Sequence, residues 1–129
     1  MFDLAQIDSV KYAEEGVELV LSPKTKEEEG SAICFYGGDS SAFKEIEQAQ
    51  NKKNRYRRTE LEDDELFDQS IERLVACTKG WRGILEYGKE IPFTKENANN
   101  LYRKYPDFRE RAAKFIFTRN NFFPTASMN

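Results

Sequence analysis

The hydrophobic pattern in the first third of the chain predicts two β-strands. In the segment Val17–Leu21 every second residue is apolar and falls on one face, and residues 33–36 form a short apolar and aromatic run. Both patterns are typical of strands. The polar stretch 22–30 between them begins and ends with turn-forming residues, so we expect an antiparallel hairpin with an unusually long loop. A weaker pattern over residues 6–12 suggests a third strand.

The next predicted element is a helix. Gly37 and Gly38 end the second strand, and either Asp39 or Ser40 can accept hydrogen bonds from the free amides of a first helical turn. The helix extends to about Asn54. Its apolar face is thin, so we expect the helix to lie on one side of the hairpin with most of its surface in water. The residues of that face are Phe43, Ile46 and Ala49.

Three more helices are predicted in the second half of the chain. Thr59 and Glu62 have the spacing of a capping box, and the acidic residues that follow suit a first turn because the helix dipole favours negative charge there. We expect this helix to stop at Gly80. Its apolar face is formed by Phe67, Ile71, Leu74, Val75 and Thr78.

The other two helices follow a connecting segment at residues 81–93. Thr94 can cap the next helix, and Pro106 ends it because proline lacks the amide that another turn requires. The final helix then carries Phe108, Ala112, Phe115, Ile116 and Arg119 on one face.

Together these elements predict an α+β fold. An N-terminal antiparallel β-hairpin, with three strands if residues 6–12 join it, and one helix precede a three-helix C-terminal half. We expect a single domain over residues 1–129, divided into a strand-strand-helix part at 1–58, a helical part at 59–123 and a frayed tail at 124–129.

The composition argues against most enzyme classes. The chain has no histidine, the side chain that most often acts as a general acid or base and the commonest metal ligand. Catalysis by Ser-His-Asp or Cys-His groups is therefore excluded, as are mixed Cys/His zinc sites. We expect no enzymatic activity, no catalytic residue, no cofactor and no metal. Cys34 and Cys77 lack a CxxC arrangement and are expected to be buried, reduced thiols.

Net charge does not dictate a partner. The chain has 20 basic and 23 acidic residues, so no overall basic field attracts nucleic acid. Nothing resembles a signal peptide or approaches the ~20 apolar residues of a membrane span. We therefore expect a cytoplasmic protein that does not bind membranes.

Two segments contain the candidate binding residues. The basic block, which we define as Lys52, Lys53, Arg55, Arg57 and Arg58, lies directly before an acidic run at residues 60–65. A small nucleic-acid-binding regulator using this block is one hypothesis, although no recognition motif accompanies it. Reversible contact with an acidic protein is the other. The turn at residues 37–40 lacks both common phosphate-binding patterns, so it is a poor phosphate site.

The aromatic residues supply the second candidate. Most of the 17 aromatic side chains must be in the core of so small a protein. Phe117 is different, because Phe115 and Ile116 face inward and helical geometry turns Phe117 at least partly outward. With Phe122 and Phe123 it could form an exposed apolar patch of the kind found at protein interfaces.

Several short motifs follow one another in order along the chain. They are YGGDSSAF at 36–43, GWRGI at 80–84, GKEIPFTKENANNLYRKYP at 88–106 and RNNF at 119–122. In order and spacing they are similar to the tail assembly chaperones of long-tailed bacteriophages and prophages. The resemblance covers residues 16–55 loosely and 80–123 more closely. The acidic loop at 23–30 departs from it, because related proteins often have a tighter turn there.

The resemblance implies a small non-catalytic protein that acts during tail morphogenesis in the cytoplasm of the bacterial host. Such chaperones are thought to keep the long helical tape-measure protein soluble and to recruit the tail-tube protein. The resemblance therefore makes the phage tape-measure and tail-tube proteins the expected partners. The sequence leaves open whether the chain also associates with itself. Nucleic acid is a less favoured partner than these two proteins.

Overall fold

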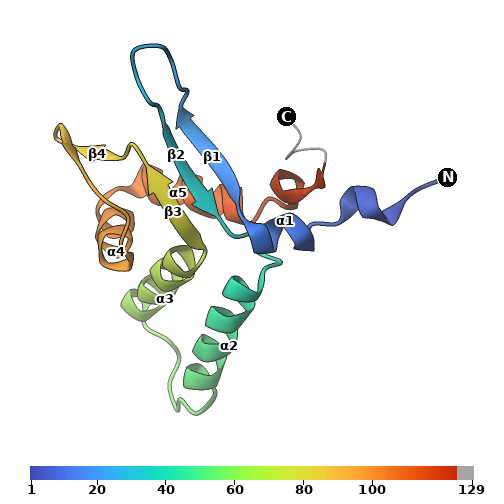
Figure 1. Cartoon of the computed structure of the whole chain (residues 1–129). Helices are drawn as coiled ribbons and strands as arrows, with labels where there is room; N and C mark the ends of the chain where they lie inside the picture. Colours follow the sequence, from blue (N-terminus) through green and yellow to red (C-terminus); the bar gives the residue numbers. More distant parts are fainter. Residues whose placement is uncertain (125–129) are drawn as a thin grey trace.

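In the computed structural model, which describes residues 1–124, three antiparallel strands form the central sheet in the order β1-β2-β3 (Figure 1). They are β1 (Val17–Ser22), β2 (Ser31–Phe35) and β3 (Thr78–Arg82). Leu19 lies opposite Ile33, which in turn lies opposite Trp81. The predicted hairpin with its long polar loop is confirmed.

The third strand is not the one we expected. Residues 6–12 contribute instead to the 3-10 helix η1 (Leu4–Ile7) and to helix α1 (Val10–Glu15). Asp3 caps η1, because its carboxylate accepts from the amide of Ala5 at 3.0 Å. Asp8 precedes Ser9, the N-cap of α1, and its carboxylate accepts from the amide of Val10 at 2.9 Å. These local hydrogen bonds favour helical turns over a strand.

Helix α3 (Asp63–Ala76) ends earlier than predicted, and β3 begins where the helical pattern suggested a last turn. The amide of Tyr36 donates to the carbonyl of Cys77 at 2.7 Å, which ties the end of the helix to the end of β2. The predicted capping box is also wrong, because Glu62 is the N-cap and its side chain makes no capping hydrogen bond. The predicted acidic first turn is confirmed.

The remaining helices match the predictions more closely. Helix α2 (Ser41–Arg55) begins after Ser40, whose hydroxyl accepts from the amide of Phe43 at 3.2 Å. Thr94 caps α4 (Lys95–Lys104) by accepting from the amide of Asn97 at 3.0 Å. Pro106 is the first residue of α5 (Pro106–Ile116), and the 3-10 helix η2 (Arg119–Phe122) follows. The segment expected to connect the helices contains a small hairpin, β4 (Leu85–Glu86) and β5 (Lys89–Glu90).

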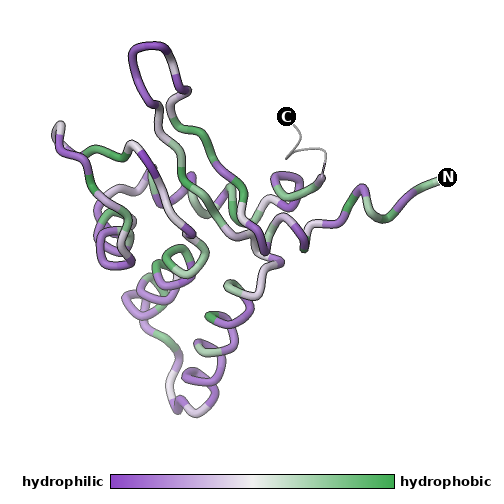
Figure 2. The backbone as a smooth tube through the Cα atoms, in the orientation of Figure 1, coloured by the Kyte–Doolittle hydropathy of each residue, from purple (hydrophilic) through white to green (hydrophobic). Residues whose placement is uncertain are grey.

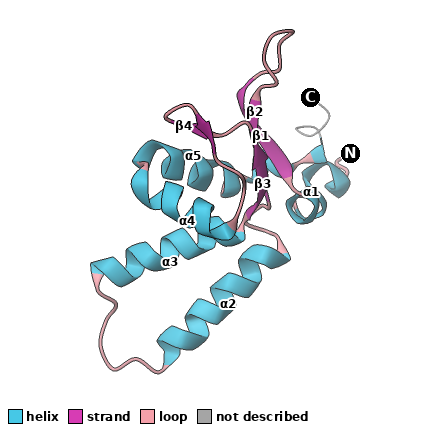
Figure 3. Ribbon diagram, turned by 60° about the vertical axis from the view of Figure 1, so that its left-hand side comes forward, coloured by secondary structure: helices cyan, strands magenta, loops and turns pink. Residues whose placement is uncertain are grey.

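The core lies between one face of the sheet and the C-terminal helices. Helix α5 runs behind β1 and β2 in Figure 1, and Figure 3 shows α4 and α5 together on the same side of the sheet. The ring of Phe35 lies 5.6 Å from that of Phe115, and the ring of Tyr102 stacks on that of Phe108 at 5.0 Å. The sheet thus joins the two halves of the chain, because β3 belongs to the half for which we expected helices alone.

Helix α3 contributes Ile71 and Leu74 to this core. Helix α2 packs against α3, and the loop that joins these two helices lies far from the sheet (Figure 3). Figure 2 shows hydrophilic residues along much of α2 and along the loop between β1 and β2. Among residues 1–124, no helix combines the length and the apolar character needed to cross a bilayer. Residues 125–129, which include most of the predicted frayed tail, lie outside the described part.

Candidate functional site

The turn at residues 37–41 joins three parts of the chain that are distant in sequence. The amide of Gly37 donates to the carbonyl of Ala13 at 3.1 Å, and the amide of Gly38 donates to the carbonyl of Ile116 at 3.0 Å. A Cβ atom at position 37 would lie 2.8 Å from the Cβ of Ala13 and 3.0 Å from the ring of Phe122. Glycine is therefore required at position 37 by the close approach of α1 and η2.

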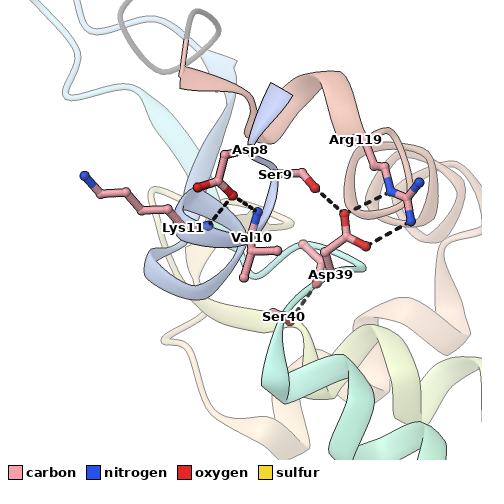
Figure 4. A network of polar contacts seen from close by, with 8 residues as sticks. Asp8, Ser9, Val10, Lys11, Asp39, Ser40 and Arg119 are labelled. Atoms are coloured by element: carbon pink, nitrogen blue, oxygen red, sulfur yellow. Dashed lines mark hydrogen bonds and ion pairs between the residues drawn. The ribbon is translucent and has the colours of Figure 1, made fainter. Parts of the chain in front are cut away.

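Asp39 is the polar centre of this junction (Figure 4). Its carboxylate accepts from the Ser9 hydroxyl at 2.5 Å and from Nε and Nη2 of Arg119 at 2.9 and 3.1 Å. The hydrogen bond from Ser9 is the main cause of the lowered pKa of Asp39, and Arg119 lowers that pKa further. A single carboxylate thus links the N-terminal segment to η2, which lies 80 residues further along the chain than Asp39.

The first turn of α2 already carries an anion of its own chain. The Glu14 carboxylate accepts from the amide of Ser41 and, at 2.8 Å, from the Ser41 hydroxyl. Because helix N-termini attract negative charge, Glu14 takes the place that a bound phosphate would need. The geometry therefore supports a structural role for the turn rather than phosphate binding.

Phe117 is an exposed ring at the edge of the same junction. Its side chain is 49% exposed, and its ring meets that of Phe43 edge-on at 5.1 Å. With Gly38, Asp39 and Arg119 it lines a hollow of about 270 Å³. Phe117 therefore presents an apolar surface beside an ion pair, a combination found at protein interfaces.

The predicted patch of three phenylalanines does not form. Phe122 is 1% exposed, because η2 folds back against α1 and places its ring against Gly37 and 5.6 Å from the ring of Phe115. Phe123 is half-buried. The expectation of an exposed ring is confirmed for Phe117 and is wrong for Phe122.

The basic block lies at the opposite end of α2 from Phe117. Helix α2 has 15 residues and is thus roughly 22 Å long, so the two candidate regions are separate. Arg57 makes two hydrogen bonds to the Glu65 carboxylate, at 2.6 and 2.9 Å, and is therefore engaged within the chain. The other four cations are exposed, and within residues 1–124 none of them takes part in an ion pair: Lys52, Lys53, Arg55 and Arg58.

Polar side chains, which the sequence interpretation overlooked, join α2 to α3. Gln50 is 2% exposed and donates to the carbonyl of Gln69 at 2.8 Å, while Arg73 donates to the Gln50 side-chain oxygen at 2.7 Å. The side-chain amides of Asn54 and Gln69 also exchange two hydrogen bonds, at 3.1 and 2.9 Å. No hydrophobic periodicity marks such residues, so the pattern could not reveal them.

Exposed apolar residues near the N-terminus were overlooked as well. They occur in η1 and at its flanks, and η1 itself has no buried residue. The sequence does contain a signal for them, because Leu4, Ile7 and Val10 recur at intervals of three residues, as on one side of a helical segment. The exposed side chains are Phe2 at 66%, Leu4 at 73%, Ile7 at 47% and Val10 at 49%.

The two cysteines are unpaired. Cys77 is fully buried, and burial raises its pKa to about 12; burial also raises the pKa of Cys34, which is half-buried. In the part of the chain that the structure describes, no three cysteine or acidic side chains come close enough to hold a metal ion.

Comparison of the chain with protein-family models, with curated proteins and with solved structures found no match.

Proposed function

We propose that this chain is a non-catalytic tail assembly chaperone that binds the tape-measure and tail-tube proteins of a long-tailed phage in the host cytoplasm. The order and spacing of the motifs at residues 16–55 and 80–123 support the proposal. The structural observation that carries it is Phe117. Its ring is half exposed, is held by Phe43, and lies beside the Asp39–Arg119 ion pair.

This surface suits an amphipathic helix. An exposed aromatic ring can cover apolar residues of a partner helix, and exposed charges next to it keep the free protein soluble. The exposed apolar side chains of Ile7 and Val10 flank Ser9, which binds Asp39 from the other side of the junction. The proposed contact surface therefore comprises Ile7, Val10 and Phe117.

The test is co-expression with the tape-measure protein encoded in the same genome. We expect the wild-type chain to raise the soluble fraction of the tape-measure protein and to co-purify with it. Phe117→Ser should abolish both effects, whereas Tyr56→Ser, which removes a ring that is 78% exposed at the far end of α2, should leave them unchanged. The proposal fails if the wild-type chain neither forms a complex nor changes the solubility.

A second candidate function is nucleic-acid binding by the basic block. The observation that favours it is the surface at the end of α2, where the exposed Tyr56 ring lies in sequence among exposed cations. Cations can bind phosphates while a ring stacks on a base. A fluorescently labelled 20-nucleotide single strand tests it by anisotropy. Binding that ignores salt, or that survives neutralisation of Lys52, Lys53, Arg55 and Arg58, would exclude this function.

A further inference from the structure

Strand β1 forms an open edge of the central sheet. It pairs with β2 on one side, and on the other side no strand of the described chain lies next to it. Within residues 1–124, the backbone of residues 17–22 makes no hydrogen bond outside the β1–β2 pair. Alternate N–H and C=O groups of β1 therefore point outward and are available to another extended chain.

A groove runs beside this edge, between β1 and α5. It has a volume of about 350 Å³, and Leu19, Leu21 and Phe115 supply much of its apolar wall. All three also pack against the hydrophobic core, which holds the wall in place. Because successive side chains of a strand point to opposite faces, a strand added to β1 would direct every second side chain into this groove.

The charge of the groove limits what can occupy it. Arg111 and Lys114 line it from α5. Arg111 already pairs with Asp107 at 2.7 Å, whereas Lys114 is exposed and has no ion pair within the described residues. Glu18 lies on the other face of β1 and pairs with Arg82 at 3.7 Å. The groove face thus favours an acidic side chain, and the opposite face does not.

This charge also argues against a second copy of the chain as the occupant. Two copies joined through their β1 edges would be related by a two-fold axis, so that each surface patch meets itself. Each copy would then bring to the other a groove that is lined by Arg111 and Lys114 and, within the described residues, by no acidic side chain, an arrangement that like-charge repulsion disfavours.

We propose that β1 and α5 form a binding groove for an extended peptide segment of a partner protein, which adds to β1 as a fourth strand. The segment carries apolar side chains at every second position and an aspartate or glutamate in the same alternation, next to Lys114. The groove does not include Phe117, and the proposal does not depend on a role of the chain in tail assembly.

Two fluorescein-labelled peptides test the chemistry. The first, Ser-Val-Thr-Val-Thr-Glu-Ser, places its glutamate on the same face as its valines. The second, Ser-Val-Thr-Val-Glu-Thr-Ser, has the same composition with the glutamate on the opposite face. We expect the full chain to bind the first peptide about tenfold more tightly, with an affinity that falls as salt is added. Equal binding of the two peptides, or no binding of either, would overturn the proposal.

Variants of the chain and of the peptide test the geometry. Lys114→Glu should weaken binding of the first peptide about tenfold, and Lys95→Glu on α4 is the matched control that should not. Methylating the peptide nitrogens that face β1 should abolish binding, whereas methylating the alternate nitrogens should not. The proposal is wrong if both methylated peptides bind alike. It is also wrong if light scattering shows a dimer whose formation blocks the peptide.

Discussion

The hydroxyl groups of Thr78 and Tyr102 lie 2.7 Å apart in the core, where they join the first residue of β3 to helix α4. The Thr78 hydroxyl donates to the carbonyl of Leu74, also at 2.7 Å, so Tyr102 is the donor in the bond between the two hydroxyls. Tyr102 is fully buried, and burial raises its pKa. These hydrogen bonds hold together the end of α3, the start of β3 and helix α4.

Removing one partner of this pair should lower the free energy of unfolding. We expect Tyr102→Phe to cost about 1 kcal/mol, because one buried hydrogen bond is lost. Thr78→Val should cost more, about 2 kcal/mol, because it loses two hydrogen bonds and leaves the Tyr102 hydroxyl without an acceptor. Urea unfolding, monitored by the fluorescence of Trp81, measures the free energy of unfolding of both variants. Tyr56→Phe, at an exposed ring, is the control, and equal costs for the two core variants would contradict this assignment of the donor.

The Asp39 link should depend on pH in the acid range. The pKa of Asp39 is lowered in the folded protein below its ordinary value of 3.8. Its charge therefore stabilises the fold above that value, and the contribution is lost as the pH falls through the lower pKa of the folded state. We expect Asp39→Asn to cost about 1 kcal/mol at pH 7. The difference from wild type should shrink below about pH 4, as measured by urea unfolding.

Arg119→Gln provides the matching variant, because it removes the second partner of the same carboxylate. Its cost should be smaller than that of Asp39→Asn, since the Arg119 side chain is 74% exposed. A stability difference for Asp39→Asn that stayed constant down to about pH 2.5 would show that its charge does not hold the junction.

A methyl group at position 37 should disrupt the junction by steric conflict. Its Cβ atom would meet Ala13 and the buried Phe122 ring at distances that ordinary contacts do not allow. We expect Gly37→Ala to lower the free energy of unfolding by about 1 to 3 kcal/mol. Gly80→Ala is the control, because a Cβ there meets nothing within 4 Å. Thermal unfolding compares the two variants, and similar melting temperatures would refute the close packing described for Gly37.

The two thiols should differ in reactivity. The thiolate is the reacting form, and a pKa of about 12 leaves Cys77 about a thousandfold less ionised at pH 8 than a free cysteine. We expect Cys34→Ser to yield a native protein that does not react with Ellman's reagent until it unfolds. Cys77→Ser should yield one that reacts slowly, through the half-buried Cys34. Rapid reaction of the Cys34→Ser variant would show that Cys77 is accessible.

Local signals allowed much of the fold to be predicted. Thr94 and Pro106 mark the ends of α4 because a capping hydroxyl and a missing amide act on adjacent backbone groups. Strand β3 gives no such signal. Its sequence, TKGWR, lacks clear alternation, and Thr78 continues the helical spacing of α3. The hydrogen bonds that place it in the sheet come from β2, more than 40 residues away in sequence.

The candidate site was predicted less completely than the fold. Neighbouring inward-facing residues identified Phe117 as outward-facing, but the burial of Phe122 depends on the return of η2 to α1 and Gly37. In the same way, Arg57 looks like any other cation in the basic block until the fold brings Glu65 to its guanidinium. Contacts between distant segments decide these roles, and hydropathy patterns carry no information about them.

The two hydrogen bonds between the side-chain amides of Asn54 and Gln69 fix the register of α2 against α3. If one helix moved along the other by a single turn, about 5.4 Å, the two amides would separate. The buried Gln50 side chain would also lose its hydrogen bonds to Gln69 and Arg73. Apolar helices can often repack after such a slip, but directional bonds tolerate no intermediate alignment. Among the possible alignments of α2 against α3, only the native one therefore satisfies all of these side-chain hydrogen bonds at once.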